Sequence, residues 1–209
     1  MMAIQQKKIA QAPPIWMPGQ IWKGQTVVLL ASGPSLSDEQ LAYVKGKALT
    51  IAINTTYKAA PWATMLYACD LKWWNWHDGA FDFEGLRVTT DVDAANLYDI
   101  AYIPGIPEPG LSTDPCAIHT GSNSGYQAIN LAALLGAKRV LLLGYDMKIA
   151  KNGASHWHGD HPDKQRSPYQ LFLDCFDTIA EQNPDIEIIN CTPGSALDCF
   201  DKSTIETMI

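Results

Sequence analysis

The sequence predicts an α/β fold of the Rossmann-like kind, in which a mostly parallel sheet carries helices on both faces. Apolar runs rich in β-branched residues recur along the whole chain, and such runs are typical of fully buried parallel strands. Amphipathic segments with helix-capping residues lie between several of these runs. Strands that alternate with helices favour a parallel sheet covered on both sides.

The first half of the chain contains three strong strand candidates. TVVLLASG (26–33) ends at a glycine and is followed by SLSDEQLAYV (35–44), an expected helix with Ser37 as its N-cap. ALTIAIN (48–54) and ATMLYACD (63–70) are the next two apolar runs, and each ends in a polar residue. We therefore expect three strands whose carboxyl ends carry small or polar residues.

The second half continues the alternation of strands and helices. The expected elements are two shorter strands at 86–91 and 98–104, a helix at 122–136, a strand at 137–146, a helix at 167–183 and a last strand at 185–191. The helix at 122–136 is the clearest, because its apolar residues form one stripe and Gly136 marks its end.

Length and composition indicate one domain. We expect residues 23–209 to form a single Rossmann-like nucleotide-binding domain, preceded by a polar, Pro-rich surface extension at 1–22. The formal net charge of −7 argues against nucleic acid as a partner, because a polyanion repels an acidic surface. The composition leaves open whether the chain forms a homo-oligomer.

The sequence also predicts a cytoplasmic location. It contains no apolar stretch of about 18 residues, the length needed for a membrane span. The N-terminal residues lack the apolar region of a secretory signal. The five cysteines are odd in number and form no C-x-x-C pair, so we expect reduced thiols.

Small polar residues gather at the expected carboxyl ends of the strands, where open α/β sheets bind ligands. This candidate nucleotide-binding set comprises Ser32, Gly33, Pro34, Ser35, Asn54, Asp70, Thr120, Gly121, Ser122, Asn123, Gly144 and Asp146. Two loops, ASGPSLS and HTGSNSG, join hydroxyls and glycines to a following helix, and free N–H groups at a helix start attract anions. We expect the phosphates of one nucleotide to lie between these two loops, although an ordinary capped turn would leave the same pattern.

These motifs resemble two related groups of proteins. The motifs are GPSL after the first strand, Asn54 after the second, and TGSNSGYQAINLAALLGAKRVLLLGYDM. With them the chain resembles the bacterial lipooligosaccharide sialyltransferases. It also resembles the 6-hydroxymethylpterin diphosphokinase-like proteins, which include uncharacterised phage relatives. The resemblance extends from about Trp22 to Cys191. It implies a nucleotide or nucleotide-sugar donor held by Gly33, Pro34, Ser35, Asn54, Thr120, Gly121 and Ser122.

The resemblance further implies a histidine base between the fifth strand and the last helix, and paired tyrosines at the leaving phosphate. The chain departs from the sialyltransferases in having Ala31 and Ser32 where they carry Gly-Asn. It also lacks a recognisable tyrosine pair, with Tyr145 and Tyr169 as the candidates. These departures concern the cytidine base and the sialic acid rather than the nucleotide site as a whole.

SHWHGDHP (155–162) provides the candidate base. Its H-x-H-x-D-H pattern matches the ligands of metallo-β-lactamase-type hydrolases, but no histidine follows His161 to complete a dinuclear zinc site, which disfavours that class. The candidate catalytic residues are His156, His158 and His161, one of which would deprotonate an acceptor hydroxyl while Asp160 orients an imidazole. A single metal ion at this loop and a purely structural loop are the alternatives.

The sequence thus predicts a nucleotide-dependent transferase, with glycosyl transfer to an acceptor hydroxyl as the first hypothesis. Diphosphoryl transfer to a hydroxymethyl, pterin-like acceptor is the second, and it would need Mg²⁺ on Asp70 or Asp146 to neutralise the phosphates. A non-catalytic nucleotide-binding or morphogenetic protein is the third. DLKWWNWHDGAFDF (70–83) holds three tryptophans, of which we expect at least one to face the ligand.

Overall fold

The computed structural model describes residues 12–159, 167–182 and 184–209. Its main sheet has eight strands in the order β10-β9-β8-β1-β2-β3-β4-β5, and every neighbouring pair is parallel. The strands are β1 (Thr26–Leu30), β2 (Leu49–Ile53), β3 (Met65–Tyr67), β4 (Leu86–Thr89), β5 (Ala101–Tyr102), β8 (Arg139–Leu143), β9 (Glu187–Asn190) and β10 (Asp201–Lys202). The predicted α/β, Rossmann-like class is confirmed.

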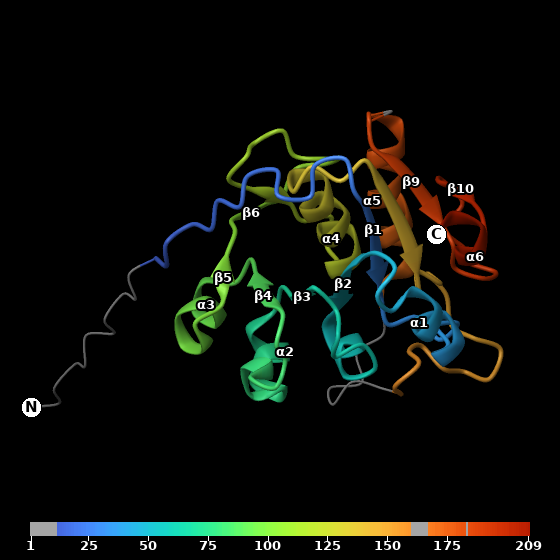
Figure 1. Cartoon of the computed structure of the whole chain (residues 1–209), viewed down its shortest axis with the longest axis horizontal. Helices are drawn as coiled ribbons and strands as arrows, with labels where there is room; N and C mark the ends of the chain where they lie inside the picture. The colour runs from blue at the N-terminus through green and yellow to red at the C-terminus, as the bar shows by residue number, and fades with distance from the viewer. Residues whose placement is uncertain (1–11, 160–166, 183) are drawn as a thin grey trace, which may run out of the picture.

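Helices cover both faces of this sheet. They are α1 (Asp38–Val44), α2 (Leu71–Trp76), α3 (Val92–Tyr98), α4 (Ser124–Leu134), α5 (Tyr169–Glu181) and α6 (Ile205–Met208), with short 3₁₀ helices η1 (Asn54–Lys58) and η2 (Asp78–Ala80). A second, two-stranded parallel sheet pairs β6 (Gly105–Ile106) with β7 (Ile118–His119). Figure 1 shows the whole arrangement.

The alternation of side chains along β1 explains why two helical layers are needed. Val27 and Leu29 pack into a core cluster with residues of α4 and α5, whereas Val28 and Leu30 pack into a second cluster with residues of α1 and α2. All four side chains are fully buried. Successive side chains of a strand point to opposite faces, so an uninterrupted apolar strand requires cover on both.

The order of the strands places a topological switch point between β1 and β8. From β1 the chain proceeds through β2, β3, β4 and β5 toward one edge, and it returns to the other side of β1 at β8. Ligands of open α/β sheets bind in the crevice outside the carboxyl ends of strands at such a point. The loops after β1 and β8 therefore flank the expected binding crevice.

The described part of the N-terminal extension lies against the domain. Trp16 donates its backbone N–H to the Tyr102 carbonyl of β5 at 2.7 Å, and Trp22 donates to the Leu135 carbonyl after α4 at 2.8 Å. In Figure 1 this segment, in blue, passes β6 and α4 before it enters β1. Trp22 is buried in the same core cluster as α4.

Several element boundaries differ from the sequence prediction. The strand expected at 98–104 is reduced to Ala101–Tyr102, because α3 extends to Tyr98 and Asp99 closes it in the left-handed conformation with φ 52°. The pair β6–β7 was not predicted, since it arises from two-residue strands in a segment rich in proline and glycine. Ser37 and Gly136, in contrast, cap their helices as expected.

Candidate functional site

A cavity of about 710 Å³ opens at the carboxyl ends of β1, β2, β3 and β8, beside the first turns of α2, α4 and α5. Among the predicted site residues, those that line it are Ser32, Gly33, Asn54, Asp70, Ser122, Asn123, Gly144, Asp146 and His156. Pro34, Ser35, Thr120, Gly121 and His158 are described but do not line it. Asp160 and His161 lie outside the described residues.

The loop after β1 does not present free donors to the cavity. The Ser35 backbone N–H donates to Oδ1 of Asp146 at 3.2 Å, and the Ser35 hydroxyl donates to Oδ2 at 2.9 Å. α1 begins only at Asp38, where Ser37 and Gln40 form a capping box. A carboxylate of the chain therefore already accepts hydrogen bonds from the Ser35 donors in the described arrangement. That Ser35 and the start of this helix hold a phosphate stays a prediction.

The packing around Gly33 leaves no room for a side chain at this position. A Cβ added to this residue would lie 2.0 Å from Oδ2 of Asp146 and 2.3 Å from the carbonyl oxygen of Gly144. The Gly33 N–H also donates to that Gly144 carbonyl at 2.8 Å. The loops after β1 and β8 thus touch each other directly across the switch point.

The loop before α4 keeps the properties that the sequence predicted. Asn123 caps the helix by accepting a hydrogen bond from the Tyr126 N–H at 2.8 Å. The next two residues, Ser124 and Gly125, line the cavity, and their N–H groups have no acceptor within the helix because they belong to its first turn. Together with the helix dipole they form the part of the cavity best suited to an anion.

Two residues of this loop support it from behind. Thr120 accepts a hydrogen bond from the Gln127 side chain at 2.9 Å through its carbonyl. Gly121 has φ 44°, and a Cβ there would lie 2.2 Å from the ring of Tyr126. Thr120 and Gly121 therefore shape the loop and leave contact with a ligand to Ser122, Asn123 and the start of α4.

Left-handed backbone conformations concentrate around the cavity. Asn54, Ser122 and Met147 have φ values of 52°, 60° and 50°, and all three line the cavity. Such conformations are uncommon for residues other than glycine and cluster at functional sites. Met147 was missed by the sequence reasoning, and no sequence pattern marks it.

The β2–β3 side of the cavity contains a row of small polar groups. The Ser124 hydroxyl lies 3.2 Å from the Cys69 thiol and donates to Oδ1 of Asn54 at 3.5 Å. Burial, followed by the charge of Asp70, raises the pKa of the Cys69 thiol to about 12. Cys69 therefore acts at this site as a neutral hydrogen-bonding group and not as a nucleophile.

Aromatic side chains of α2 form one wall of the cavity. Trp73 and Trp74 are buried, and their indole N–H groups donate to Thr55 and to the Ala68 carbonyl respectively. Trp76 is only partly buried and lines the cavity together with Trp73. The Nζ of Lys72 lies 5.1 Å from the centre of the Trp76 ring. Lys72 was missed by the sequence reasoning, although it follows Asp70 by two positions.

The two candidate tyrosines, Tyr145 and Tyr169, differ in their exposure to the cavity. Tyr145 is fully buried and donates its hydroxyl to the Gly125 carbonyl at 3.0 Å, so that hydroxyl is not available to a leaving phosphate. Tyr169 lines the cavity from the start of α5, where burial raises its pKa. Phe172 lies one turn further along the same wall and was also missed.

The histidine-containing loop is attached to the sheet by Trp157. The Trp157 N–H donates to the Ser32 carbonyl at 3.1 Å, and its indole N–H donates to the Thr56 hydroxyl at 3.2 Å. The rings of His156 and His158 stack with centres 5.2 Å apart, and of the two only His156 lines the cavity. Across residues 12–159, 167–182 and 184–209 no group of three or more potential ligands is arranged to hold a metal ion.

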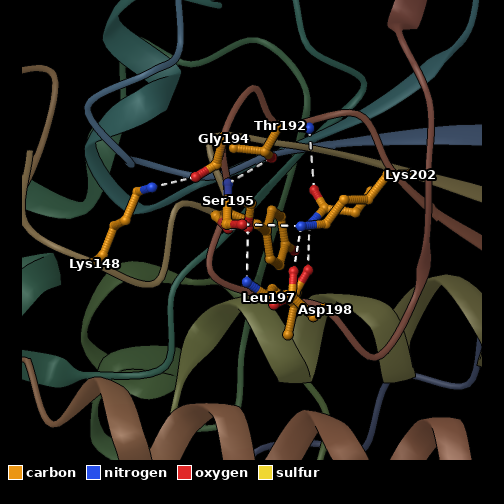
Figure 2. A network of polar contacts seen from close by, with 9 residues as sticks. Lys148, Thr192, Gly194, Ser195, Leu197, Asp198 and Lys202 are labelled. Carbon is orange, nitrogen blue, oxygen red and sulfur yellow. Dashed lines mark hydrogen bonds and ion pairs between the residues drawn. The ribbon is translucent and has the colours of Figure 1, made fainter.

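The end of β8 is fixed by the segment that follows β9. Figure 2 shows this network, in which the Ser195 hydroxyl donates to the Tyr145 carbonyl at 2.5 Å and accepts the Leu197 N–H at 3.0 Å. Nζ of Lys148 donates to the Gly194 carbonyl (Figure 2). Next to this network, the Ala196 N–H donates to the backbone carbonyl of Asp146 at 2.9 Å. The network therefore determines where Asp146 projects into the cavity.

No helix in the described residues is both long and apolar enough to cross a membrane. Comparisons of the chain with protein families, with curated proteins and with solved structures gave no match.

Proposed function

We propose that the protein is a nucleotide-dependent transferase, and that it transfers a glycosyl group from a nucleotide-sugar donor to an acceptor hydroxyl. The observation that carries this proposal is that one cavity collects the start of α4, Asn54, Asp70 and the aromatic wall at the carboxyl ends of four parallel strands. Its volume of about 710 Å³ falls within the range of small-molecule sites.

The donor's phosphates are assigned to the start of α4. Ser122, Ser124 and Gly125 line the same cavity, where the positive end of an 11-residue helix also lies. Lys72 is a cationic side chain on the same cavity lining. The loop at 33–35 supports the site by packing against β8 and is not a phosphate contact in this proposal.

The donor's base is assigned to Trp76. A partly exposed indole beside a phosphate site gives a flat apolar surface on which a nucleobase can stack. Transfer to a hydroxyl also needs a group that accepts its proton. His156 is the candidate that the sequence pattern anticipated, because among the described candidate histidines it lines the cavity.

The charges of the cavity favour a second candidate function, diphosphoryl transfer from a nucleoside triphosphate. Among the described residues, the lining contains the carboxyl groups of Asp70 and Asp146 against one lysine, Lys72. A triphosphate entering such a site needs Mg²⁺ to balance its charge. Asp70, which is exposed and lines the cavity, would be the protein ligand.

A ligand screen by thermal shift tests both functions and the non-catalytic alternative. UDP, CDP, GDP and ADP, each with and without Mg²⁺, should raise the melting temperature for at least one base, since a ligand at 100 times its Kd stabilises by about 2.7 kcal/mol. Gly125→Val, which places a side chain against the Tyr145 ring, should abolish the shift. Asp99→Asn, exposed at the end of α3, is the matched control.

EDTA separates the two transferase mechanisms, because it should stop diphosphoryl transfer and spare metal-free glycosyl transfer. The absence of a shift with all four nucleotides, with and without Mg²⁺, would contradict the proposal. Binding without turnover of any nucleotide sugar or of ATP would identify a non-catalytic nucleotide-binding protein.

A further inference from the structure

The cavity contains a buried carboxyl group with no part in the assignments above. Asp146 is 5% exposed, yet it lines the cavity. Ser35 donates one hydrogen bond to each carboxylate oxygen, at 3.2 and 2.9 Å. An ionised carboxylate offers about four acceptor positions, so two remain after these bonds.

The backbone holds this carboxyl group in a fixed position. Gly33 leaves room for Oδ2, because any Cβ there would overlap it, and Gly144 turns the chain with φ 72° two residues before Asp146. The Asp146 carbonyl accepts the Ala196 N–H at 2.9 Å. Met147, with φ 50°, continues the unusual backbone on the other side. The two hydrogen bonds from Ser35 fix the carboxylate, and the bond from Ala196 fixes its backbone, which is the kind of placement that catalysis needs.

The neighbours of Asp146 indicate which ligand group it can accept. Its oxygens take hydrogen bonds from an N–H and a hydroxyl, and the nearby Lys148 directs its Nζ to the Gly194 carbonyl. Within the described ranges, no lysine or arginine forms an ion pair with it. A phosphate would be repelled by such a carboxylate, whereas a hydroxyl of the acceptor would find an acceptor for its proton.

Asp146 lines the same cavity as the proposed phosphate site. Tyr145, the preceding residue, donates its hydroxyl to the Gly125 carbonyl in the first turn of α4 at 3.0 Å. The end of β8 and the start of α4 are therefore in direct contact. An acceptor hydroxyl bound at Asp146 would be next to a donor whose phosphates lie on α4.

We propose that Asp146, rather than His156, is the catalytic base that takes the proton from the acceptor hydroxyl; this rests on the proposed transferase function. The acceptor O–H bond breaks and its proton moves to a carboxylate oxygen of Asp146. The acceptor oxygen forms a bond to the anomeric carbon of the donor. The bond from that carbon to the phosphate oxygen breaks, and its electron pair leaves with the nucleotide.

Two further observations favour Asp146 over His156. His156 neighbours Trp157, which donates hydrogen bonds to Ser32 and Thr56. Asp146 lies three residues after β8, and both its side chain and its backbone carbonyl accept hydrogen bonds. Burial raises the pKa of Asp146 above its ordinary value, although its hydrogen bonds with Ser35 act in the opposite direction. A carboxyl group with raised proton affinity is a better base near neutral pH.

The test compares Asp146→Asn with His156→Gln in donor hydrolysis, in which water replaces the acceptor. The Asn amide keeps both bonds to Ser35, with Oδ1 accepting the N–H and Nδ2 donating to the hydroxyl. UDP-glucose, UDP-N-acetylglucosamine, GDP-mannose and CMP-N-acetylneuraminic acid are the probes, and released nucleotide is measured by chromatography. We expect Asp146→Asn to lower turnover by about 100-fold or more, and by a larger factor than His156→Gln. Asp99→Asn, exposed at the end of α3, is the variant that should leave turnover within about 3-fold.

Sodium formate added to Asp146→Ala provides a readout that a structural role would not affect. Formate should restore part of the turnover that Asp146→Ala has lost. It should leave the turnover of the control variant Asp99→Asn unchanged. Nucleotide affinity, measured by calorimetry with the nucleotide that gave the thermal shift, should change by less than about 3-fold in Asp146→Asn.

An Asp146→Asn variant that releases nucleotide as fast as a wild-type protein that hydrolyses at least one of the four donors would overturn the assignment. So would an Asp146→Ala variant that formate fails to activate. Failure of the transferase proposal is distinct from both, since the wild type would then show no thermal shift with any nucleotide, or would bind a nucleotide without turning over any of the donors.

Discussion

Replacing Gly33 by alanine should destabilise the protein strongly, although the change adds only one methyl group. The added Cβ would lie 2.0 Å from Oδ2 of Asp146 and 2.3 Å from the carbonyl oxygen of Gly144. The carboxyl group can rotate away, but the carbonyl belongs to the backbone at the end of β8 and accepts the Gly33 N–H. The loops after β1 and β8 must therefore separate.

The magnitude follows from the contacts that are lost. Overpacking a filled space costs about 1–3 kcal/mol. Displacement of Asp146 also breaks two hydrogen bonds from Ser35 to a charged group, for which about 2 kcal/mol in total is a conservative value. We expect a loss of about 4 kcal/mol, which for a chain of this size corresponds to a fall in Tm of roughly 8–16 °C.

Urea denaturation and calorimetry of Gly33→Ala measure this loss, with Gly24→Ala as the control. Gly24 has φ 74° and no atom within 4 Å of its added Cβ, so its replacement tests backbone strain without a clash and should cost about 1–2 kcal/mol. In an Asp146→Ala background, Gly33→Ala should cost less but still destabilise, because the Gly144 carbonyl remains. A free energy of unfolding within 1 kcal/mol of the wild type would refute the packing role of Gly33.

Three further predictions concern other contacts of the site. Ser195→Ala should cost about 1–3 kcal/mol in urea denaturation, because it removes the donor to the buried Tyr145 carbonyl and the acceptor of a backbone N–H. Because its pKa is about 12, the Cys69 thiol should resist iodoacetamide at pH 8 in the folded protein and become alkylated after unfolding. Mass spectrometry measures the alkylation, and rapid labelling of the folded protein would contradict the prediction. Trp157→Phe removes the hydrogen bond to Thr56, so proteolysis of its loop should become faster while the free energy of unfolding falls by about 1 kcal/mol. An unchanged cleavage rate would contradict the role of Trp157 in holding the loop.

The parts of the fold that the sequence predicted are those fixed by local patterns. The buried strands such as β1 and β8 consist almost entirely of apolar residues, and no other placement could bury them. Caps such as Ser37 depend on residues within one turn, so the sequence displays them directly. The pair β6–β7 depends instead on hydrogen bonds between two distant two-residue segments, and propensity gives no indication of such a pair.

The candidate site likewise contains features that local sequence patterns predict and features that depend on distant contacts. The loop before α4 was predicted correctly as the start of a helix because its glycines, hydroxyls and Asn123 cap are local features. The loop at 33–35 has the same composition, but its donors are used by Asp146, which lies 111 positions away in the chain. Composition can show that a loop is able to bind an anion. Only the tertiary fold shows that a carboxylate of the protein already accepts hydrogen bonds from the donors of that loop.

The contact between Ser35 and Asp146 joins the two loops at the topological switch point. The two residues follow β1 and β8, the strands that flank this point, and their hydrogen bonds tie the loops together there. The β2–β3 side of the same cavity is lined by Asn54, the start of α4 and Trp76. Asp146 lines the cavity together with them, so its bonds to Ser35 do not remove the carboxyl group from the site. This leaves a hydrogen-bond acceptor in the same cavity as the anion-binding end of α4, an arrangement suited to a hydroxyl that attacks a phosphate-bearing donor.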